Sequence, residues 1–503
     1  MKLNLNLKKW SIGLVAVSLL FSGCRKQPVE EPPVDTTPDP PTQTVDENAK
    51  KYKHVNTFAW NLMNTYYLWR DEISAALKAW KDTEEPIQKV REVRYKDANG
   101  KDIDRWTMLT DDMESMQGNV SGHTRTLGMD FQLYYVDQTH TDICAVVTFV
   151  YAGSPAEKAG LCRGDAIMTV DGSTMTGDNY QEMIYDHLLG GGTVSLGVYG
   201  RNKAISVTAV DMYEDPVHIA KVLERPDGRK VGYLHFTSFT LDACERLIEV
   251  FQNFTQAGID DMVLDLRYNG GGYVITETVL GSMLAPLKEV EAGSVFSREV
   301  YNSTLAQSWS DDPTCFTTTF SFTNNGVQKN LSTAGANPDL SRLFVLVTGA
   351  SASASESLIC GLSPYMPVTV IGEQTSGKYC AGFMMDAEEW YDSIQNQLSA
   401  FDYAEAKQLV ENWGMYIMYS RYADCNGETL SMPDGITPSV AAYDDPLDGY
   451  DLGDPAETML SVAVGLIEGR TRSAGTPSAP HLAPVSEDFH PRTTGLLIGK
   501  FEL

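Results

Sequence analysis

The spacing of apolar residues along the chain predicts three folded regions of different character. Between 46 and 112, Val55, Phe58, Leu62 and Met63 recur at intervals of three and four, which is the periodicity of a helix with one buried face. We therefore expect a small N-terminal helical domain over 46–112.

Short strands and turns follow between 113 and 214. A Ser-Pro pair at 154–155 can start a short helix that ends at Gly160, and the Asp-Gly pair at 171–172 predicts a hairpin turn. This texture differs from that of the helical region before it, so we expect a separate small domain here.

From 215 to 470 the pattern alternates between strand and helix. Continuous apolar runs predict buried strands over 231–236, 262–266 and 343–347, and an amphipathic helix lies over 243–254. This alternation is typical of an α/β domain.

The first 23 residues have the composition of an export signal peptide. A basic start with Lys2, Lys8 and Lys9 precedes the apolar run 12–21, which is too short to span a bilayer as a mature helix. The run ends in Leu-Phe-Ser-Gly-Cys, which resembles a bacterial lipobox and implies that Cys24 is lipidated. An ordinary secretory signal with an incidental cysteine is the alternative.

Both ends of the mature chain are expected to be irregular. Residues 24–45 are rich in Pro, Glu, Asp and Thr, cannot bury a core, and predict a semi-rigid tether between a lipid anchor and the folded domains. Residues 471–503 are rich in Ser, Pro, Thr and His and predict an irregular tail.

Composition narrows the classes of partner. The 503 residues carry a formal net charge of −28, which disfavours nucleic acid and anionic lipid, and 43% hydrophobic residues are enough for buried cores. Seven cysteines follow Cys24, and none of them forms a pair at metal-ligand spacing. Disulfides are open to an exported chain, but we favour buried thiols that pack as small apolar groups.

A candidate nucleophile and a candidate base lie in the α/β region. The segment 351–356 carries three serines between a predicted strand and a predicted helix, and no histidine lies between His235 and His481. A serine nucleophile here therefore needs another proton acceptor, and a desolvated lysine can fill that role. Lys378, in the segment 375–378, is the candidate.

The region 113–214 resembles a PDZ domain of the type found beside bacterial proteases, on the residues 152–161, 163–167 and 170–172. The resemblance implies a loop whose backbone amides hold the carboxylate of a peptide, with a ligand strand added beside it. We place this peptide-binding loop at Leu127, Gly128, Met129 and Phe131. A PDZ domain that serves only as a spacer or lid is the alternative.

The order of these motifs resembles the tail-specific, or C-terminal processing, peptidase family. In that family the nucleophile lies three residues before a Glu and 25 before the base; Ser353 has Glu356 and Lys378 at these spacings, whereas Ser351 and Ser355 have neither. The resemblance implies catalytic roles for Ser353 and Lys378 and a supporting role for Glu356. It also implies an α/β fold with a crotonase-like (ClpP/crotonase) protease core over 215–470.

The resemblance further implies an oxyanion hole. A glycine-rich segment follows the strand over 262–266, and we assign one donor to the amide of Gly271, with Gly272 as its neighbouring alternative. The second donor is the amide of Ala354, which follows the nucleophile at the start of a helix.

Two departures from the family concern the base. Tyr379 stands where the family often has Gly and could narrow the cleft, and Gly382 stands where it often has a Gln that positions the lysine. Something else must therefore orient Lys378. Its pKa must also fall from about 10.4 to roughly 7–8, which burial can supply.

These residues predict a serine endopeptidase with a Ser-Lys dyad that cleaves exported proteins or peptides. We expect it to be lipid-anchored in the bacterial cell envelope, with the outer membrane as the expected membrane, and to need no cofactor and no metal. The alternative is a surface-tethered peptide-binding protein whose core no longer cleaves. Acyl-thioester chemistry is a weaker third reading, because the chain lacks an evident nucleotide site.

Overall fold

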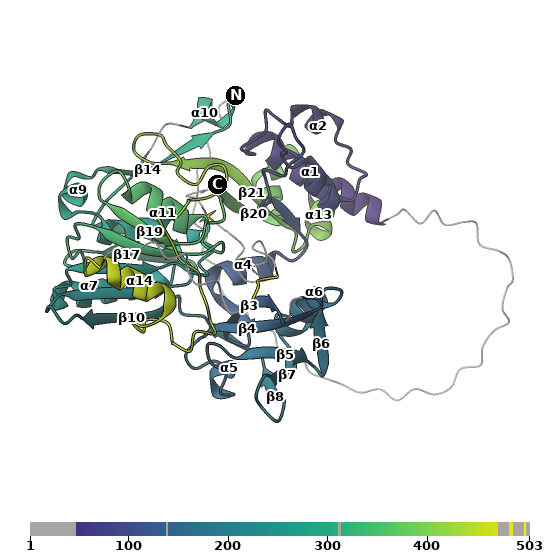
Figure 1. Ribbon diagram of the computed structural model, residues 1–503. Helices are drawn as coiled ribbons and strands as arrows, with labels where there is room; N and C mark the ends of the chain where they lie inside the picture. Colours follow the sequence, from purple (N-terminus) through teal and green to yellow (C-terminus); the bar gives the residue numbers. More distant parts are fainter. Residues whose placement is uncertain (1–46, 137–138, 310–312, 471–481, 486–496, 499–503) are drawn as a thin grey trace, which may run out of the picture. The chain divides into compact units, whose positions relative to one another are not determined.

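The computed structural model describes residues 47–136, 139–309, 313–470, 482–485 and 497–498 (Figure 1). The predicted signal peptide over 1–23 and the tether over 24–45, with Cys24, lie outside these residues, as does most of the predicted tail. For these segments the sequence-based predictions stand as predictions.

A six-stranded sheet forms the centre of the α/β region. Its strand order is β10-β11-β12-β18-β19-β22, in which β10 is antiparallel to its neighbour and the other strands are parallel. The predicted strands are confirmed within one or two residues, since continuous apolar runs are typical of strands buried on both faces. The bounds are β10 (Val217–Glu224), β11 (Lys230–Phe236), β12 (Asp261–Asp265), β18 (Leu343–Val347), β19 (Val368–Gly372) and β22 (Val440–Ala441).

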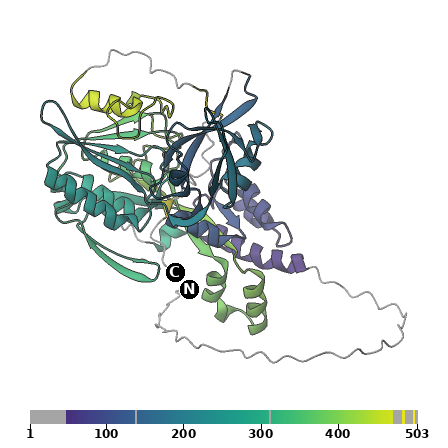
Figure 2. The same cartoon turned by 90° about the horizontal axis from the view of Figure 1, so that it is seen from below.

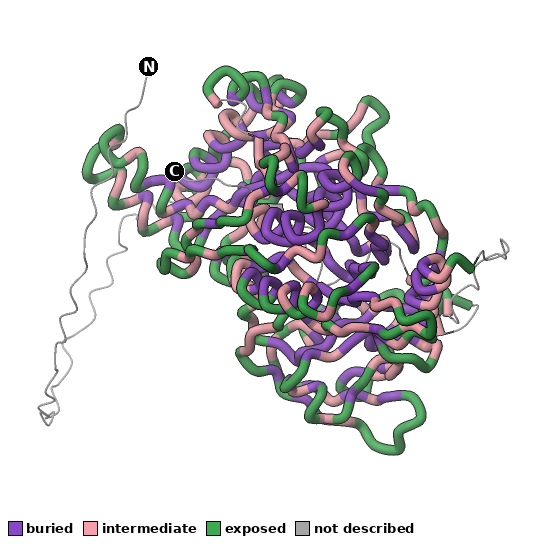
Figure 3. The backbone as a smooth tube through the Cα atoms, turned by 90° about the vertical axis from the view of Figure 1, so that its left-hand side faces the viewer, coloured by how far each residue is buried: buried purple, intermediate pink, exposed green. Residues whose placement is uncertain are grey.

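Helices cover both faces of this sheet. In β12, Met262 and Leu264 belong to the largest hydrophobic cluster of the protein, whereas Val263 belongs to a second cluster on the opposite face. The first face packs against α7 (Ala243–Ala257), α8 (Val274–Leu284) and α11 (Ala354–Leu362), and the second against α14 (Thr458–Ile467). Figure 3 shows the buried residues concentrated in this layered body.

A second sheet lies beside the first and shares its larger cluster. Its order is β13-β23-β20-β21-β14-β15, and β1 also pairs with β21. The strands are β1 (Met108–Thr110), β13 (Gly272–Tyr273), β14 (Val295–Tyr301), β15 (Thr314–Cys315), β20 (Cys380–Asp386), β21 (Gly414–Ala423) and β23 (Leu497–Ile498). Shorter elements complete this region: α9 (Leu287–Ala292), α10 (Leu305–Ser308), the hairpin β16 (Thr319–Asn324) with β17 (Val327–Ser332), α12 (Ala387–Ser393), a 3-10 turn (Gln395–Gln397) and α13 (Ala400–Leu409).

The N-terminal helices are α1 (Glu47–Thr65), α2 (Ser74–Ala79) and α3 (Pro86–Val93). The periodicity of α1 is confirmed, because Val55, Phe58, Leu62 and Met63 are all buried. These side chains share one cluster with the two sheets, and α1 packs against α12 and α13 (Figure 2). A helical domain with its own core is therefore not confirmed.

The PDZ region is built on a six-stranded sheet of order β3-β4-β6-β5-β7-β8, with a hydrophobic cluster of its own. The Asp-Gly pair at 171–172 makes the predicted turn between β5 and β6, with positive φ at both residues. The elements are β3 (Met129–Tyr135), β4 (Asp142–Val150), α5 (Pro155–Lys158), β5 (Ala166–Val170), β6 (Ser173–Thr176), α6 (Tyr180–Glu182) with a π-helical continuation (Met183–Leu188), β7 (Thr193–Val198) and β8 (Ile205–Thr208). Helix α4 (Met113–Ser121) and the pair β2 (His123–Thr126) and β9 (Val210–Tyr213) adjoin it.

Buried charges join the PDZ region to the α/β region. Arg163 forms an ion pair of 2.8 Å with Asp444 and donates to the hydroxyl of Tyr268 at 3.0 Å. Arg267 lies behind them, fully buried, and forms ion pairs of 2.7 Å with Asp265, Asp444 and Glu457. This network was not predicted from the sequence.

Candidate active site

Ser353 lies between β18 and α11, in the strand-turn-helix position that the sequence predicted. It is fully buried and has a φ of 63°, which a residue other than glycine rarely adopts. Backbone strain of this kind is kept where the surrounding structure holds it, and it clusters at functional sites. The geometry presents Ser353 at the N-terminus of α11.

The hydroxyls of the three serines differ in their partners. The Oγ of Ser351 donates to the carbonyl of Leu266 at 2.8 Å, and the Oγ of Ser355 donates to the carbonyl of Asn269 at 3.0 Å. Within the described residues, the buried Oγ of Ser353 has no hydrogen-bond partner. Ser351 and Ser355 therefore bind the backbone at Leu266 and Asn269, whereas the hydroxyl of Ser353 makes no such bond.

The carboxylate of Glu356 ties the serine segment to the lysine segment. One of its oxygens, Oε2, accepts from the amides of Ser353 and Lys378, both at 2.9 Å. The other, Oε1, accepts from the amide of Gly377 at 2.8 Å and from the hydroxyl of Thr375 at 2.5 Å. The backbones of Ser353 and Lys378 therefore lie within two hydrogen-bond lengths of each other.

Lys378 is fully buried, and burial lowers the pKa of its ammonium to about 8. Weaker effects of Cys380, Asp104 and Glu356 act in the opposite direction but do not overcome burial. Nζ also lies 5.7 Å from the ring centroid of Trp106. A substantial fraction of Lys378 is neutral near pH 8, as a general base requires.

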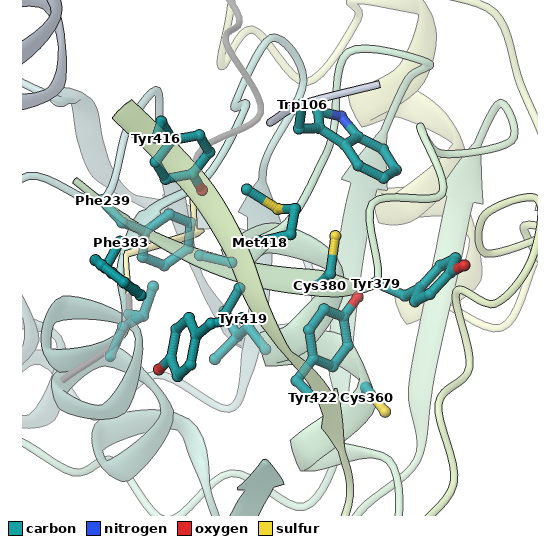
Figure 4. Close-up of a cluster of buried hydrophobic side chains, with 14 of the residues drawn as sticks. Trp106, Phe239, Cys360, Tyr379, Cys380, Phe383, Tyr416, Met418, Tyr419 and Tyr422 are labelled. Atoms are coloured by element: carbon teal, nitrogen blue, oxygen red, sulfur yellow. The ribbon is translucent and has the colours of Figure 1, made fainter. Parts of the chain in front are cut away.

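Tyr416 on β21 orients this lysine. Nζ of Lys378 donates to the hydroxyl of Tyr416 at 3.0 Å. At Gly382, a Cβ would lie 2.6 Å from Cζ of Tyr416, so only glycine leaves room for this ring. The tyrosine thus occupies the space that a side chain at 382 would take, which accounts for the departure noted at that position. Figure 4 shows Tyr416 with its neighbours Trp106, Met418 and Cys380.

The two predicted oxyanion donors, the amides of Ala354 and Gly271, differ in their hydrogen bonding. Ala354 is the first residue of α11, where backbone amides have no partner within the helix. The amide of Gly271 donates to Oδ1 of Asn269 at 2.9 Å, and the same Asn269 holds the serine segment by accepting from the amide of Ala352 at 3.1 Å. A role for Gly271 as donor stays a prediction and requires that its amide turn from Asn269 to the substrate.

A cavity of about 470 Å³ adjoins the lysine segment. Tyr379 forms part of its wall, and its ring lies edge-to-face with that of Trp69, with the ring centroids 6.4 Å apart. Arg105, which also lines the cavity, donates to the carbonyl of Ser376 at 3.0 Å. The size suits a few side chains of a bound peptide. Its lining comprises Lys101, Asp102, Ile103, Arg105, Trp106, Gly349, Gln374, Thr375, Ser376, Gly377, Tyr379, Pro433 and Asp434.

The predicted peptide-binding loop begins β3, and its apolar side chains are buried in the PDZ core. The side chains of Leu127, Met129 and Phe131 belong to that cluster. The amide of Gly128 donates to Oγ1 of Thr126 at 2.9 Å, and that of Phe131 to Oδ1 of Asp130 at 2.8 Å. Recognition of a carboxylate by these two amides stays a prediction and competes with these local bonds.

Other candidate chemistry is separate from this site. His218 and His235 contact each other through their Nδ1 atoms at 2.9 Å at the junction with the PDZ region, and burial lowers the pKa of His235 to about 3. The cysteines that the structure describes are free thiols. Within the same residues, no group of three metal-ligating side chains is arranged to hold an ion, and no helix is both long and apolar enough to span a bilayer.

Two parts of the chain match the sequence models of known families. Residues 230–441 match the sequence model of peptidase family S41, and residues 146–188 match that of the PDZ domain. The first of these matches covers the segments that hold Ser353, Glu356, Lys378 and Gly271. They support the resemblance to the C-terminal processing peptidases.

Individual relatives extend the comparison. A carboxyl-terminal-processing protease of Picosynechococcus sp. is 28% identical over 269 residues, which are 52% of this chain and 56% of the relative. A carboxyl-terminal-processing protease of Synechocystis sp. is 27% identical over 239 residues, which are 45% of this chain and 48% of the relative. The chain thus spans about half the length of the curated relatives it matches. A crystal structure described as an S41 protease from Bacteroides fragilis has a TM-score of 0.60 at 23% identity, covering 82% of this chain and 97% of that one. This likeness shows a shared α/β fold; it does not confirm a crotonase-like core.

Proposed function

We propose that this chain is a serine endopeptidase in which Ser353 is the nucleophile and Lys378 the general base. The observation that carries this proposal is a fully buried lysine with a pKa near 8 whose amide shares one carboxylate oxygen with the amide of Ser353. The match to peptidase family S41 supports the same chemistry.

In the proposed reaction, Oγ of Ser353 attacks the carbonyl carbon of a peptide bond, and its proton passes to neutral Lys378. The tetrahedral oxyanion accepts from the amide of Ala354 and from that of Gly271 once it leaves Asn269. Lys378 then gives the proton to the leaving amine, which leaves an acyl ester on Ser353. Lys378 next takes a proton from the water that attacks this ester, and it returns that proton to Oγ of Ser353 as the bond between Oγ and the acyl carbon breaks and the acid product leaves.

Tyr416 is a positioning residue in this scheme. A neutral amine has one lone pair, and a hydrogen bond from Nζ to the hydroxyl of Tyr416 fixes one N–H and so restricts where that lone pair can point. Glu356 positions the two segments through its four hydrogen bonds and does not itself exchange a proton with the substrate.

We further propose that the substrates are exported proteins or peptides, that the PDZ region receives their C-termini, and that Cys24 anchors the enzyme in the cell envelope. The PDZ match and the similarity to carboxyl-terminal-processing proteases support protein or peptide substrates that are recognised at their C-termini, and the signal-like sequence over 1–23 supports their being exported. The lipobox-like sequence before Cys24 is the support for the third.

The test is cleavage of an unfolded protein such as reduced casein by the purified chain and by Ser353→Ala. Ser363→Ala, an exposed serine just after the same helix, is the matched control. We expect cleavage by the wild type and the control and none by Ser353→Ala. No cleavage by the wild type would favour the alternative of a peptide-binding protein, and cleavage by Ser353→Ala would exclude Ser353 as nucleophile.

A further inference from the structure

The edge of the PDZ sheet is occupied by the chain's own C-terminal region. The amide of Tyr135 donates to the carbonyl of Ala483 at 2.9 Å, and the amide of Val485 donates to the carbonyl of Leu133 at 3.0 Å. Tyr134 and Pro484 form an antiparallel bridge between these bonds. The segment 482–485 thus adds to β3 as a short strand.

Side chains fix this segment on two sides of the edge. Val485 packs against the PDZ cluster, to which Tyr180 and Met183 of the neighbouring helical turn also contribute. Leu482 packs against a separate cluster that includes Tyr134. Addition of a strand to an exposed sheet edge is the way a PDZ domain takes a peptide ligand.

A second part of the same C-terminal region pairs beside the candidate active site. Strand β23 (Leu497–Ile498) lies between β13 and β20, where Leu497 and Ile498 pair with Gly272 and Tyr273, and Ile498 also pairs with Gly382. β13 directly follows Gly271, and β20 begins two residues after Lys378. The backbone of β23 therefore fills a strand position between the oxyanion segment and the base.

A cavity of about 330 Å³ connects the PDZ edge with the peptidase region. Gln132 of β3 and Pro484 of the docked segment line one part, and Thr348 and Gly349, just before the serine segment, line another. Gly349 and Gln374 also line the larger cavity, whose wall includes Thr375, Ser376 and Gly377. The two cavities therefore meet at Gly349 and Gln374, between the PDZ edge and the segment 375–378.

We propose that the C-terminal region is an intramolecular competitor of substrate, which occupies the β3 edge through 482–485 and the strand position beside the active site through 497–498. This inference rests on the proposed peptidase function. The docked segment makes only two backbone hydrogen bonds with β3, so it holds mainly because it is tethered and its local concentration is high. A substrate strand of similar sequence, apolar at the positions of Leu482 and Val485, can displace it.

The test compares the full chain with Val485→Pro, which removes the amide that donates to Leu133 and the side chain that packs on the PDZ core. Ala483→Ser is the matched control, because this exposed side chain can change while both backbone bonds remain. Two quantities are measured: hydrogen exchange at the Tyr135 amide in a Ser353→Ala background, and the rate of cleavage of fluorescein-labelled casein below its KM.

We expect faster exchange at Tyr135 in Val485→Pro than in the control. If the segment fills the edge in about four molecules of five, its release raises kcat/KM about fivefold. Ile498→Pro, which disturbs the pairing beside the active site, should raise kcat/KM in the same direction.

The outcomes separate this inference from the proposed function. Unchanged exchange at Tyr135 in Val485→Pro would overturn the docking of 482–485, whatever the activity. Faster exchange with unchanged kcat/KM in both proline variants would overturn competition with substrate. Faster exchange without cleavage by any variant would support the docking and overturn the proposed peptidase activity.

Discussion

Arg267 and Lys378 are both fully buried cations, yet their surroundings give them opposite protonation behaviour. Burial by itself lowers the pKa of Arg267, but the carboxylates of Asp265, Glu457 and Asp444 together outweigh it and hold the pKa well above its ordinary value. At Lys378, burial outweighs the weaker opposing effects and lowers the pKa to about 8. Counter-charges, and not burial alone, decide whether a buried cation stays charged.

The opposite pKa shifts of Arg267 and Lys378 fit different roles: a structural role for Arg267 and the proposed role of general base for Lys378. Arg267 joins the sheet to the loop of Asp444 and, through Asp444, to Arg163 of the PDZ region. A permanently charged guanidinium suits this task. At Lys378 burial favours the neutral amine, which can accept a proton, even though the phenol of Tyr416 and the rings of Trp106 and Tyr416 near Nζ favour the charged form.

The largest expected effect comes from making Lys378 permanently charged. Lys378→Arg should lower kcat/KM for a peptide by about 10⁴-fold or more, as should Ser353→Ala, because a guanidinium cannot accept the proton of Ser353. The double variant should lose no more than either single one, since the two residues act as a unit. Kinetics on a fluorogenic peptide measure this, with Lys288→Arg, an exposed lysine, as control. Activity of Lys378→Arg within tenfold of the wild type would refute the dyad.

Replacement of each buried cation by methionine should change stability in opposite directions. Arg267→Met removes an ion-pair partner from three buried carboxylates, of which Asp444 keeps Arg163, and should lower the free energy of unfolding by about 3–5 kcal/mol. Lys378→Met should raise the free energy of unfolding at pH 7 by up to about 3 kcal/mol. The pKa of Lys378 is about 8 in the folded state and about 10.5 in the unfolded state, so the charged lysine destabilises the folded state at pH 7.

The sign of the pH dependence follows from the same shift. The folded-state pKa of Lys378 is lower than the unfolded one, so the wild type gains stability as the pH rises from about 8 to 10.5, and below pH 8 the penalty is constant. Urea denaturation of the wild type and of Lys378→Met at pH 7 and pH 10 should therefore give a smaller difference at pH 10. Equal differences at both pH values would contradict a lowered pKa.

A smaller effect is expected at Tyr416. Tyr416→Phe removes one hydrogen bond to Nζ and should lower kcat about tenfold with little change in KM, since a bond of this kind contributes about 1–1.5 kcal/mol. The bond favours the protonated amine, so its loss should also move the pKa of Lys378 downward. A pH profile of kcat for Tyr416→Phe measures both, and Tyr403→Phe, whose hydroxyl binds Asp392, is the control. A change confined to KM would indicate a role in substrate binding instead.

The sequence predicted the α/β strands well because they are continuous apolar runs; the strand predicted over 343–347 has the same bounds as β18. It also predicted α1, but periodicity identifies a buried face and not its cover. That face packs into the cluster shared with both sheets, and β1 pairs with β21 far along the chain. Long-range packing of this kind leaves no local signal.

At the site, the spacing that favoured Ser353 agrees with the hydroxyl partners of its two neighbours. Tyr416 could not be identified, since it lies 38 residues from Lys378 and reaches it across paired strands. The signal in the sequence was Gly382. It stands where the family often has a Gln that positions the lysine, so another residue had to take that role. The charged network around Arg267 and the pairing of 482–485 with β3 likewise depend on contacts between distant segments.

The most direct test of the dyad is the pH dependence of kcat/KM of the wild type on a fluorogenic peptide without ionisable groups. This profile reports the pKa of the essential base in the free enzyme. The account predicts an ascending limb with a midpoint near 8, where Lys378 loses its proton. A midpoint near 6.5, the value of an ordinary imidazole, or a rise only above about pH 10, the value of an ordinary lysine, would contradict it.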